Sequence, residues 1–460
     1  MRAVITPHCF GGTVRIPGSK SHTIRRLLIA ALAGGDSEIE YPLDSLDAFS
    51  CLSICRALGA EIEEFREADP SCPNPPDESG KRLLRWKVRG TGGRISHPAA
   101  PLDVGNSGTT LFLALAAAAL GAENVTFTGD EQIRRRSAGP LLEALGNFGI
   151  AVKSEKNGCA PITIRGPWLG GRTSLPCPTS QYLSAILLAA PLAPAGRVTE
   201  IDVPLLNEKP YIELTLSYLD AQGIIYEKKD DFSYFRIPGG ASYKPLNGKV
   251  PGDFSSAAFP ALAAVVSAAA NGPAPGSAAG VRGLTLLGLD PADPQGDKAF
   301  FSMLGQMGCG VDWRKLDDGE WALAISLPEK LTGVTFDLND TPDLLPAMAV
   351  LGLYARGETA LVNAAHARIK ETDRIAVMAS ELAKFGGELW ERPDGLVIKP
   401  PERRLVEPGK LLAGWGDHRV VMALAAAALG AEGPVTIDQA ECAAVTYPGF
   451  LELLDADIVY

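Results

Sequence analysis

The chain has 460 residues, of which 46% are hydrophobic and 21% charged, a balance typical of a globular protein rather than a disordered one. Its length favours two large domains. The net charge of −11 argues against general binding to nucleic acids or anionic membranes, because both attract an excess of Lys and Arg. Any site for an anionic ligand must therefore be a local concentration of positive charge.

Three further features of the sequence bear on where the protein works. The longest stretch without charge, from Ser255 to Val281, is broken by Pro260 and two later prolines and is therefore a poor membrane span. No signal-peptide or transit-peptide pattern precedes the first predicted strand, so we expect a cytoplasmic protein. The eight cysteines are scattered without metal-binding spacing, which favours a reducing compartment and argues against a structural metal.

In chain order, the first notable stretch is Pro17–Arg26, between a short strand pattern at Thr13–Ile16 and an apolar helix pattern at Leu27–Leu32. Small residues at such a helix start leave backbone N–H groups available to an anion, and Lys20 and Arg25 add full positive charges. The stretch predicts a phosphate-binding helix start. A capped helix with solvated basic residues would also explain it when it is taken alone.

An apolar helix, a glycine and a short strand recur as a pattern along the chain. The glycines suit helix C-cap positions with positive φ, and the alternating apolar residues after them suit half-buried strands. A sixth, frayed copy closes the chain at 450–460, so we predict six folding units. The glycines of the first five copies are Gly59, Gly149, Gly223, Gly308 and Gly386.

Each unit also contains a second helix pattern made almost entirely of Ala and Leu. Helices that are apolar on nearly every face are buried, so we expect three of them in the centre of each domain. If they run parallel, their N-termini converge, and two such faces opposed across a cleft would bind anions. The patterns span Leu27–Ala33, Leu111–Leu120, Tyr182–Leu192, Ala257–Ala270, Leu344–Tyr354 and Val420–Leu429.

Short polar motifs precede these six helices. Five of the motifs contain Ser or Thr, which cap helix N-termini, and Asp417 can cap the sixth helix. The motifs are Gly18–Ser21, Gly105–Thr109, Thr179–Gln181, Gly252–Ser256, Thr341–Asp343 and Asp417–Arg419.

The chain is expected to pass between the two domains at two places. The first lies near Pro17 and Gly18, and the second falls in the Pro- and Gly-rich stretch at 238–245. We therefore expect a discontinuous domain of residues 1–18 plus 245–460 and a continuous domain of residues 19–244. The candidate active site would lie in the cleft between them.

Three charged stretches each have two interpretations. Arg368–Arg374 is either a salt-bridged helix start or a set of anion ligands, Lys370 and Arg374, with Glu371 as acid or base. The motif at 417–419 is either a helix N-cap followed by two solvated side chains or part of an anion-binding site. The arginine triplet at 134–136, unusual in an acidic chain, is either a solvated basic face or an anion ligand.

Taken together and in order, these motifs resemble those of the 5-enolpyruvylshikimate-3-phosphate synthase (3-phosphoshikimate 1-carboxyvinyltransferase) family. The resemblance runs from about residue 10 to the C-terminus. It implies the α/β (α+β) enolpyruvyl transferase fold, with two domains that each contain three βαβαββ units and buried parallel helices. It also implies transfer of the enolpyruvyl group from phosphoenolpyruvate to the 5-hydroxyl of shikimate 3-phosphate, in the shikimate pathway. A monomer that needs no metal or organic cofactor is expected.

The resemblance also assigns site residues, with the acid and base groups on the discontinuous domain. The implied catalytic residues are Lys20, Asp343, Glu371 and His418. The implied shikimate 3-phosphate ligands are Lys20, Ser21, Arg25, Thr179, Ser180, Gln181, Tyr211, Asp343, His366 and Lys370. The implied phosphoenolpyruvate ligands are Lys20, Asn106, Gly108, Arg136, Gln181, Glu371, Arg374 and Arg419. Gly108 matches the family position associated with glyphosate sensitivity.

The chemistry requires groups of these types. The methylene carbon of phosphoenolpyruvate must be protonated while the hydroxyl attacks its neighbour, so the site needs a proton donor and a proton acceptor. We assign Asp343 to the hydroxyl proton, and Glu371 with Lys20 to the methylene carbon and the leaving phosphate. Clustered arginines would stabilise the negative charge of the intermediate.

The chain departs from the family pattern at several positions. Phe112 stands where Arg is usual, Ile24 where Asn is usual, and His366 where Asn is frequent. Glu208 replaces a phosphate-binding Ser, and Val445 replaces a Lys. These changes keep two alternatives open: a diverged enolpyruvyl transferase with another hydroxyl acceptor, and a non-catalytic anion-binding paralogue. A related transferase for UDP-N-acetylglucosamine is disfavoured, because residues 130–136 contain no reactive Cys.

Overall fold

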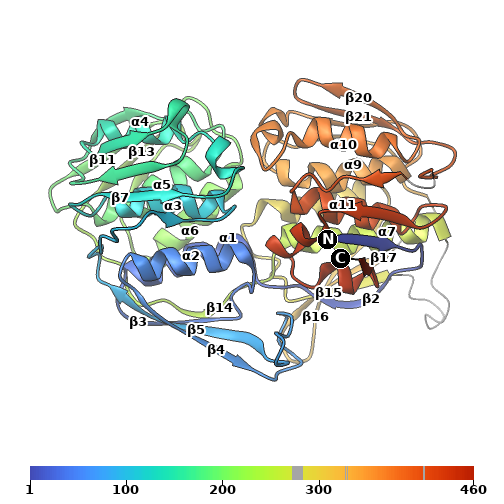
Figure 1. Ribbon diagram of the computed structural model, residues 1–460, viewed down its shortest axis with the longest axis horizontal. Helices are drawn as coiled ribbons and strands as arrows, with labels where there is room; N and C mark the ends of the chain where they lie inside the picture. Colours follow the sequence, from blue (N-terminus) through green and yellow to red (C-terminus); the bar gives the residue numbers. More distant parts are fainter. Residues whose placement is uncertain (272–282, 327, 329, 408–409, 460) are drawn as a thin grey trace. The chain divides into compact units, whose positions relative to one another are not determined.

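The computed structural model describes residues 1–271, 283–326, 328, 330–407 and 410–459 (Figure 1). Part of the uncharged stretch named above, residues 272–281, lies outside the described residues. The chain divides into two compact units, residues 18–250 and residues 1–17 with 251–460. We expected the second boundary at residue 245. It falls later because strand β14 (Asn247–Lys249) pairs with β3 (Gly34–Glu40) of the 18–250 unit.

The described residues form six four-stranded sheets with one common plan. In each sheet the first two strands in spatial order are parallel, and the third lies antiparallel between the second and the fourth. In the 18–250 unit the sheets are β14-β3-β5-β4, β6-β7-β9-β8 and β10-β11-β13-β12. The further strands are β4 (Glu61–Glu67), β5 (Arg82–Thr91), β6 (Leu102–Asp103), β7 (Val125–Thr128), β8 (Ala151–Ser154), β9 (Ile162–Arg165), β10 (Gly171–Ser174), β11 (Val198–Asp202), β12 (Glu227–Lys228) and β13 (Tyr234–Pro238).

The other unit repeats the plan with β2-β15-β17-β16, β18-β19-β21-β20 and β22-β23-β1-β24. The family fold implied by the sequence motifs, with six similar units, is thereby confirmed. The strands are β1 (Arg2–Ile5), β2 (Gly12–Arg15), β15 (Gly283–Leu287), β16 (Gly310–Lys315), β17 (Trp321–Ser326), β18 (Thr335–Asp337), β19 (Thr359–Val362), β20 (Glu388–Arg392), β21 (Gly395–Lys399), β22 (Leu411–Leu412), β23 (Val435–Asp438) and β24 (Asp457–Val459).

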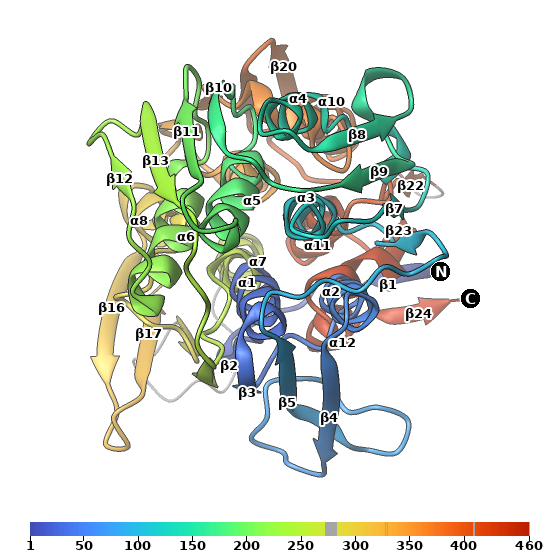
Figure 2. The same cartoon turned by 90° about the vertical axis from the view of Figure 1, so that its left-hand side faces the viewer.

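Three Ala- and Leu-rich helices occupy the core of each unit. Every residue of α3, α9 and α11 is buried, since these helices have no polar face to turn to solvent. Figure 2 looks onto the 18–250 unit, with the strands of its sheets around α1, α3 and α5. The inner helices are α1 (Lys20–Leu32), α3 (Gly108–Ala118), α5 (Gln181–Ala189), α7 (Phe254–Asn271), α9 (Leu345–Tyr354) and α11 (His418–Ala428).

A second set of helices, one per sheet, packs outside the inner ones. These helices alternate with the inner ones along the chain, as the repeat predicts. They are α2 (Leu46–Ala57), α4 (Gly139–Asn147), α6 (Lys209–Gln222), α8 (Ala299–Gln306), α10 (Arg374–Ala383) and α12 (Phe450–Leu453).

Several inner helices begin earlier than their apolar runs. The run that starts at Leu27 belongs to a helix that starts at Lys20, and the run at Val420 to one that starts at His418. The polar residues before each run already have helical conformation, and the Asp417 side chain caps α11 as predicted. Lys20 and Arg419 therefore each lie on the first turn of an inner helix.

The chain exchanges a strand each time it passes between the units. β2 precedes α1 in sequence but pairs with β15, while β14 precedes α7 but pairs with β3. The backbone N–H of Asp253 donates to the carbonyl oxygen of Pro17 over 3.0 Å, so the two crossing segments are neighbours in unit 1–17/251–460. Among the described residues, no helix is both long and apolar enough to cross a membrane.

Candidate active site

Helix α1 begins with two residues that the sequence motifs point to. Lys20 is the first residue of the helix, and its Nζ lies 3.1 Å from Oδ2 of Asp47 in the first turn of α2. Sequence analysis missed Asp47, whose one signal is its place as an acid in the first turn of a helix. Ser21 follows Lys20, and its carbonyl oxygen accepts a hydrogen bond from Arg25.

Arg25 is almost entirely buried, with 2% of its surface exposed. Its guanidinium donates to Oγ1 of Thr215 over 2.9 Å and to Oγ of Ser184 over 3.3 Å. It also donates to the carbonyl oxygens of Ser21 and Tyr211. Burial lowers the pKa of Arg25 to about 10. Arg25 therefore joins α1 to α5 and α6, a structural role that the sequence did not indicate.

The start of α3 brings a glycine against an arginine. A Cβ atom at Gly108 would lie 2.5 Å from Nη1 of Arg136, so the absence of a side chain lets the guanidinium approach the first turn of the helix. Backbone N–H groups at a helix start and a guanidinium both attract anions. Asn106 precedes this turn, and its amide donates to Asp130 over 2.5 Å and to Gln132 over 2.8 Å.

The starts of α3 and α5 are hydrogen-bonded to each other. Nε2 of Gln181 donates to Oγ1 of Thr109 over 3.1 Å. The two helices also pack against each other, so they run parallel with their N-termini at the same end. Nearby, Phe112 lies edge to face with Tyr182, with ring centroids 5.1 Å apart. An aromatic pair thus occupies the position where the resemblance predicts an arginine.

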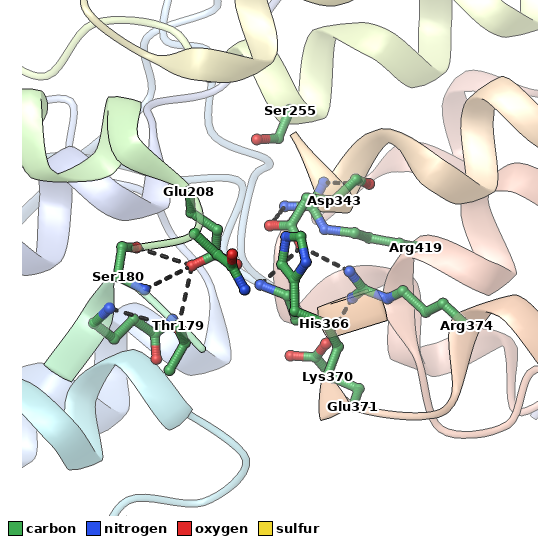
Figure 3. A network of polar contacts seen from close by, with 12 residues as sticks. Thr179, Ser180, Glu208, Ser255, Asp343, His366, Lys370, Glu371, Arg374 and Arg419 are labelled. Carbon is green, nitrogen blue, oxygen red and sulfur yellow. Dashed lines mark hydrogen bonds and ion pairs between the residues drawn. The ribbon is translucent and has the colours of Figure 1, made fainter. Parts of the chain in front are cut away.

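The carboxylate of Glu208 binds the start of α5 (Figure 3). Its Oε2 accepts hydrogen bonds from the backbone N–H of Ser180 over 3.0 Å, from the Ser180 hydroxyl over 2.9 Å and from the Thr179 hydroxyl over 3.2 Å. Ser180 itself makes no side-chain cap, whereas the hydroxyl of Thr179 accepts a hydrogen bond from the backbone N–H of Gln181 over 3.5 Å. Glu208, the residue just before α6, supplies the acceptor for the backbone N–H of Ser180.

In the other unit, ion pairs join the starts of α9, α10 and α11 (Figure 3). Oδ2 of Asp343 lies 2.9 Å from Nη2 of Arg419, and Oδ1 lies 2.7 Å from Nη1 of Arg374. Nζ of Lys370 is 3.7 Å from the same Oδ1. One carboxylate therefore lies among three cations.

Arg374 is almost entirely buried, with 1% of its side chain exposed. It donates to Oε2 of Glu371 over 2.6 Å and to Oδ2 of Asp417 over 2.8 Å. Asp417 in turn accepts from the backbone N–H of Arg419 and caps α11. The salt-bridged helix start that the sequence allows for this stretch is thus present. Arg374 holds the carboxylates in place in this structure.

Burial and charge act in opposite directions on the pKa of Asp343. Burial would raise it, but Arg419, Lys370 and Arg374 together outweigh burial and hold the pKa of Asp343 well below its ordinary value. Asp343 is therefore ionised at neutral pH. Its basicity rises when these cations are drawn toward another anion.

Asp297, which sequence analysis missed, extends the network to α7. It lies in the single turn η4 (Gly296–Lys298), 4.0 Å from Nη1 of Arg419, and accepts a hydrogen bond from the hydroxyl of Ser255. Burial raises the pKa of Asp297 to about 6, although Arg419 opposes this effect. Its sequence signal was weak, because several acids share the loop at 290–297.

Two histidines and one departure from the family pattern belong to the same unit. Nε2 of His366 lies 3.0 Å from the carbonyl oxygen of Asn339, so this nitrogen carries a proton. His418 is the buried first residue of α11. Val445 ends the short helical segment η7 (Ala440–Val445), where the resemblance predicts a lysine.

The predicted site residues therefore lie in two clusters, one in each unit. Each combines helix N-termini with cations, and the second adds two carboxylates, a set that can bind anions and exchange protons. Within the described ranges, no group of three His, Cys, Asp or Glu side chains is placed to hold a metal ion. The first cluster contains Lys20, Ser21, Arg25, Asn106, Gly108, Arg136, Thr179, Ser180, Gln181 and Tyr211, and the second contains Asp343, His366, Lys370, Glu371, Arg374, His418 and Arg419.

Comparison with known proteins places the chain in a family. The family model for EPSP synthase (3-phosphoshikimate 1-carboxyvinyltransferase) matches residues 6–454. A 3-phosphoshikimate 1-carboxyvinyltransferase of Acetivibrio thermocellus is 47% identical over 444 residues, which cover 96% of this chain and 95% of the relative. One of Halobacterium salinarum is 39% identical over 458 residues, covering 99% and 98%.

A solved structure with lower sequence identity belongs to the same family. EPSP synthase from Acinetobacter baumannii superimposes with a TM-score of 0.75 at 26% identity, over 99% of this chain and 97% of that one. Family model, relatives and structure thus agree over nearly the whole length. This chain belongs to the EPSP synthase (3-phosphoshikimate 1-carboxyvinyltransferase) family of transferases.

Proposed function

We propose that this protein transfers the enolpyruvyl group of phosphoenolpyruvate to the 5-hydroxyl of shikimate 3-phosphate and releases phosphate, a step toward chorismate and the aromatic amino acids. Membership of the family supports the reaction. The observation that carries the proposal is the carboxylate of Asp343 among Arg419, Arg374 and Lys370. In this arrangement the cations would bind the anionic substrates, and the carboxylate would accept the proton of the attacking hydroxyl.

Asp343 would accept the proton of the 5-hydroxyl as that oxygen attacks the central carbon of phosphoenolpyruvate. As the substrate anions draw Arg419 and Lys370 toward them, the pKa of Asp343 rises from its depressed value and the carboxylate becomes a better base. Glu371 with Lys20 would protonate the methylene carbon as the hydroxyl adds, and would take a proton back from the resulting methyl group as phosphate leaves, so that the double bond of the enolpyruvyl group is restored. His418 would act beside them.

The phosphoenolpyruvate ligands would come from both units. Arg136 at Gly108, Lys20, Asn106 and Gln181 would act from the 18–250 unit, together with Glu371, Arg374 and Arg419 from the other. The guanidinium of Arg136 lies close to the start of α3, where backbone N–H groups are also available. This proximity supports the assignment, because both kinds of group attract an anion to the same place. Arg374 would act mainly by holding Asp343, since its guanidinium is already bonded to three carboxylates.

The shikimate 3-phosphate ligands would be the hydroxyl and backbone donors at the start of α5, with side chains from both units. The bonds that these donors make to Glu208 support the view that they bind an anionic group. The full proposed set is Lys20, Ser21, Arg25, Thr179, Ser180, Gln181, Tyr211, Asp343, His366 and Lys370.

A second candidate function is transfer to a different hydroxyl acceptor. One observation favours it: the carboxylate of Glu208 occupies the donors at Thr179 and Ser180 that would hold the acceptor's phosphate. A non-catalytic paralogue is the remaining alternative. It is opposed by the presence of Asp343, Glu371 and Lys20, since anion binding alone gains nothing from two carboxylates.

We also propose that the protein acts in the cytoplasm and as a monomer. None of the cysteines in the described part of the chain is joined in a disulfide, as suits a reducing compartment. One chain carries both clusters of proposed ligands, so the reaction needs no residue from a second copy.

The test is release of phosphate by the purified full chain. Phosphoenolpyruvate is supplied alone and with shikimate 3-phosphate, unphosphorylated shikimate or UDP-N-acetylglucosamine. We expect phosphate release with shikimate 3-phosphate and no release with phosphoenolpyruvate alone. Turnover with another acceptor and none with shikimate 3-phosphate would establish the second candidate function. No turnover with any acceptor would identify a paralogue without catalytic activity.

A further inference from the structure

We infer that Glu208 is a specificity-determining residue that competes, from within the chain, with the phosphate of the acceptor. The inference rests on the proposed function in that the α5 start is taken as the place where this phosphate binds. It concerns the strength and selectivity of acceptor binding rather than the reaction itself.

The donors at the start of α5 already hold an anion in this structure. A single carboxylate oxygen of Glu208 accepts from one backbone N–H and two hydroxyl groups, at distances of 2.9 to 3.2 Å. Glu208 is 2% exposed, so water competes little for these bonds. A buried carboxylate with three donors at a helix N-terminus is a stable internal ligand.

A phosphate group cannot use the same donors while the carboxylate stays. The backbone N–H of Ser180 has one hydrogen to donate, as has each of the hydroxyl groups of Thr179 and Ser180. A phosphate placed beside the carboxylate would also be repelled by its charge. The phosphorylated acceptor must therefore displace Glu208 from Ser180 and Thr179.

The backbone of Glu208 is consistent with displacement. Its φ is +58°, in the left-handed region that residues other than glycine adopt at a cost. When phosphate takes the α5 donors, the three side-chain contacts of Glu208 to Thr179 and Ser180 end.

The expected consequence is selectivity. A phosphorylated acceptor must displace Glu208 before it can bind the α5 donors, and this displacement costs free energy. Its affinity for the protein is therefore lower than it would be if the donors were not already bonded to Glu208. An acceptor without a phosphate does not require the displacement. Removal of the carboxylate should therefore strengthen binding of shikimate 3-phosphate and leave binding of unphosphorylated shikimate unchanged.

The experiment compares the full-length protein with Glu208→Ser and Glu208→Gln by titration calorimetry with shikimate 3-phosphate and with shikimate. The first variant removes the carboxylate, and the second keeps the shape of the side chain without its charge. Glu213→Gln, at an exposed residue of α6, the helix that follows Glu208, is the matched control for loss of one negative charge. Thermal unfolding shows that each variant is folded.

We expect shikimate 3-phosphate to bind roughly tenfold more tightly to Glu208→Ser, and more tightly also to Glu208→Gln, because a repulsive charge of this kind is removed. Shikimate affinity and the Glu213→Gln control should stay within about twofold of the unchanged protein. Unchanged or weaker binding of shikimate 3-phosphate to both Glu208 variants would overturn the inference and make Glu208 a support or a ligand of the acceptor.

Turnover separates this outcome from failure of the proposed function. If the calorimetric shift is found but no variant releases phosphate with shikimate 3-phosphate, the proposed reaction is wrong and the competition stands. If phosphate is released but binding does not change in the Glu208 variants, the reaction stands and the competition is wrong.

Discussion

Oδ2 of Asp343 and Nη2 of Arg419 form an ion pair of 2.9 Å between the starts of two buried helices. The pair joins the proposed base to a proposed ligand of phosphoenolpyruvate. In the proposed reaction, binding of the substrate anion to Arg419 would weaken one of the contacts that depress the pKa of Asp343. Substrate binding and activation of the base would then be coupled through this ion pair.

Asp343→Asn should lower kcat by about 10²- to 10⁴-fold, because the proposed general base is lost. The KM for phosphoenolpyruvate should change much less, since Arg419 then has one competing anion fewer. Steady-state phosphate release measures both constants. Asp312→Asn, at an exposed carboxylate of β16, is the control and should keep the kcat of the unchanged protein. A kcat for Asp343→Asn within tenfold of the unchanged protein would remove Asp343 from this role.

Gly108→Ala should raise the KM for phosphoenolpyruvate by roughly tenfold, since the new Cβ displaces the guanidinium of Arg136 from the α3 start. The stability of the fold should hardly change, because the displaced atom is the far end of a flexible side chain. Glyphosate inhibition should weaken in parallel. Gly146→Ala in α4 is the control, because no atom lies within 4 Å of its added Cβ. Equal kinetics in both variants would contradict the prediction.

Arg25→Lys should lower the free energy of unfolding by about 2–3 kcal/mol, because an ammonium group cannot keep the hydrogen bonds of the guanidinium to Thr215, Ser184 and the backbone. Urea denaturation measures the change. Arg135→Lys, whose side chain is 74% exposed, should stay within about 0.5 kcal/mol of the unchanged protein. If the two variants are equally stable and Arg25→Lys loses only acceptor affinity, Arg25 is a ligand rather than a structural residue.

The titration of Asp297 should lower the free energy of unfolding as the pH rises. Its pKa in the folded state is about 6, above its ordinary value of 3.8, so between these values the folded state binds the proton that the unfolded state has lost. The free energy of unfolding of the unchanged protein, relative to Asp297→Asn, should therefore decrease by roughly 1–2 kcal/mol from about pH 5 to about pH 7. Urea denaturation at several pH values checks this. A parallel pH dependence in both proteins would show that Asp297 does not titrate in this range.

The sequence was a good guide to features that depend on neighbouring residues. The positive φ values of Gly59, Gly149, Gly223, Gly308 and Gly386 agree with the predicted helix ends. The burial of α3, α9 and α11 follows from their composition, and the cap at Asp417 follows from its place before α11. These signals are local, so the pattern of residue types carries them directly.

Features that depend on distant partners were not predictable in this way. Asp47 and Asp297 gain importance only because folding brings them to Lys20 and Arg419. The attachment of residues 245–250 to the 18–250 unit rests on the pairing of β14 with β3, about 200 residues away in the chain. The sequence identified Glu208 as a departure, but only the fold supplies its three donors at the start of α5.

The exchange of strands also has a consequence for biosynthesis. β1 and β2 leave the ribosome first, yet β1 pairs with β23 and β24, and β2 pairs with β15. All strands of the 18–250 unit have been translated once Val250 has been added. This unit is therefore able to fold during translation, whereas the last sheet of its companion must wait until β24 has been translated.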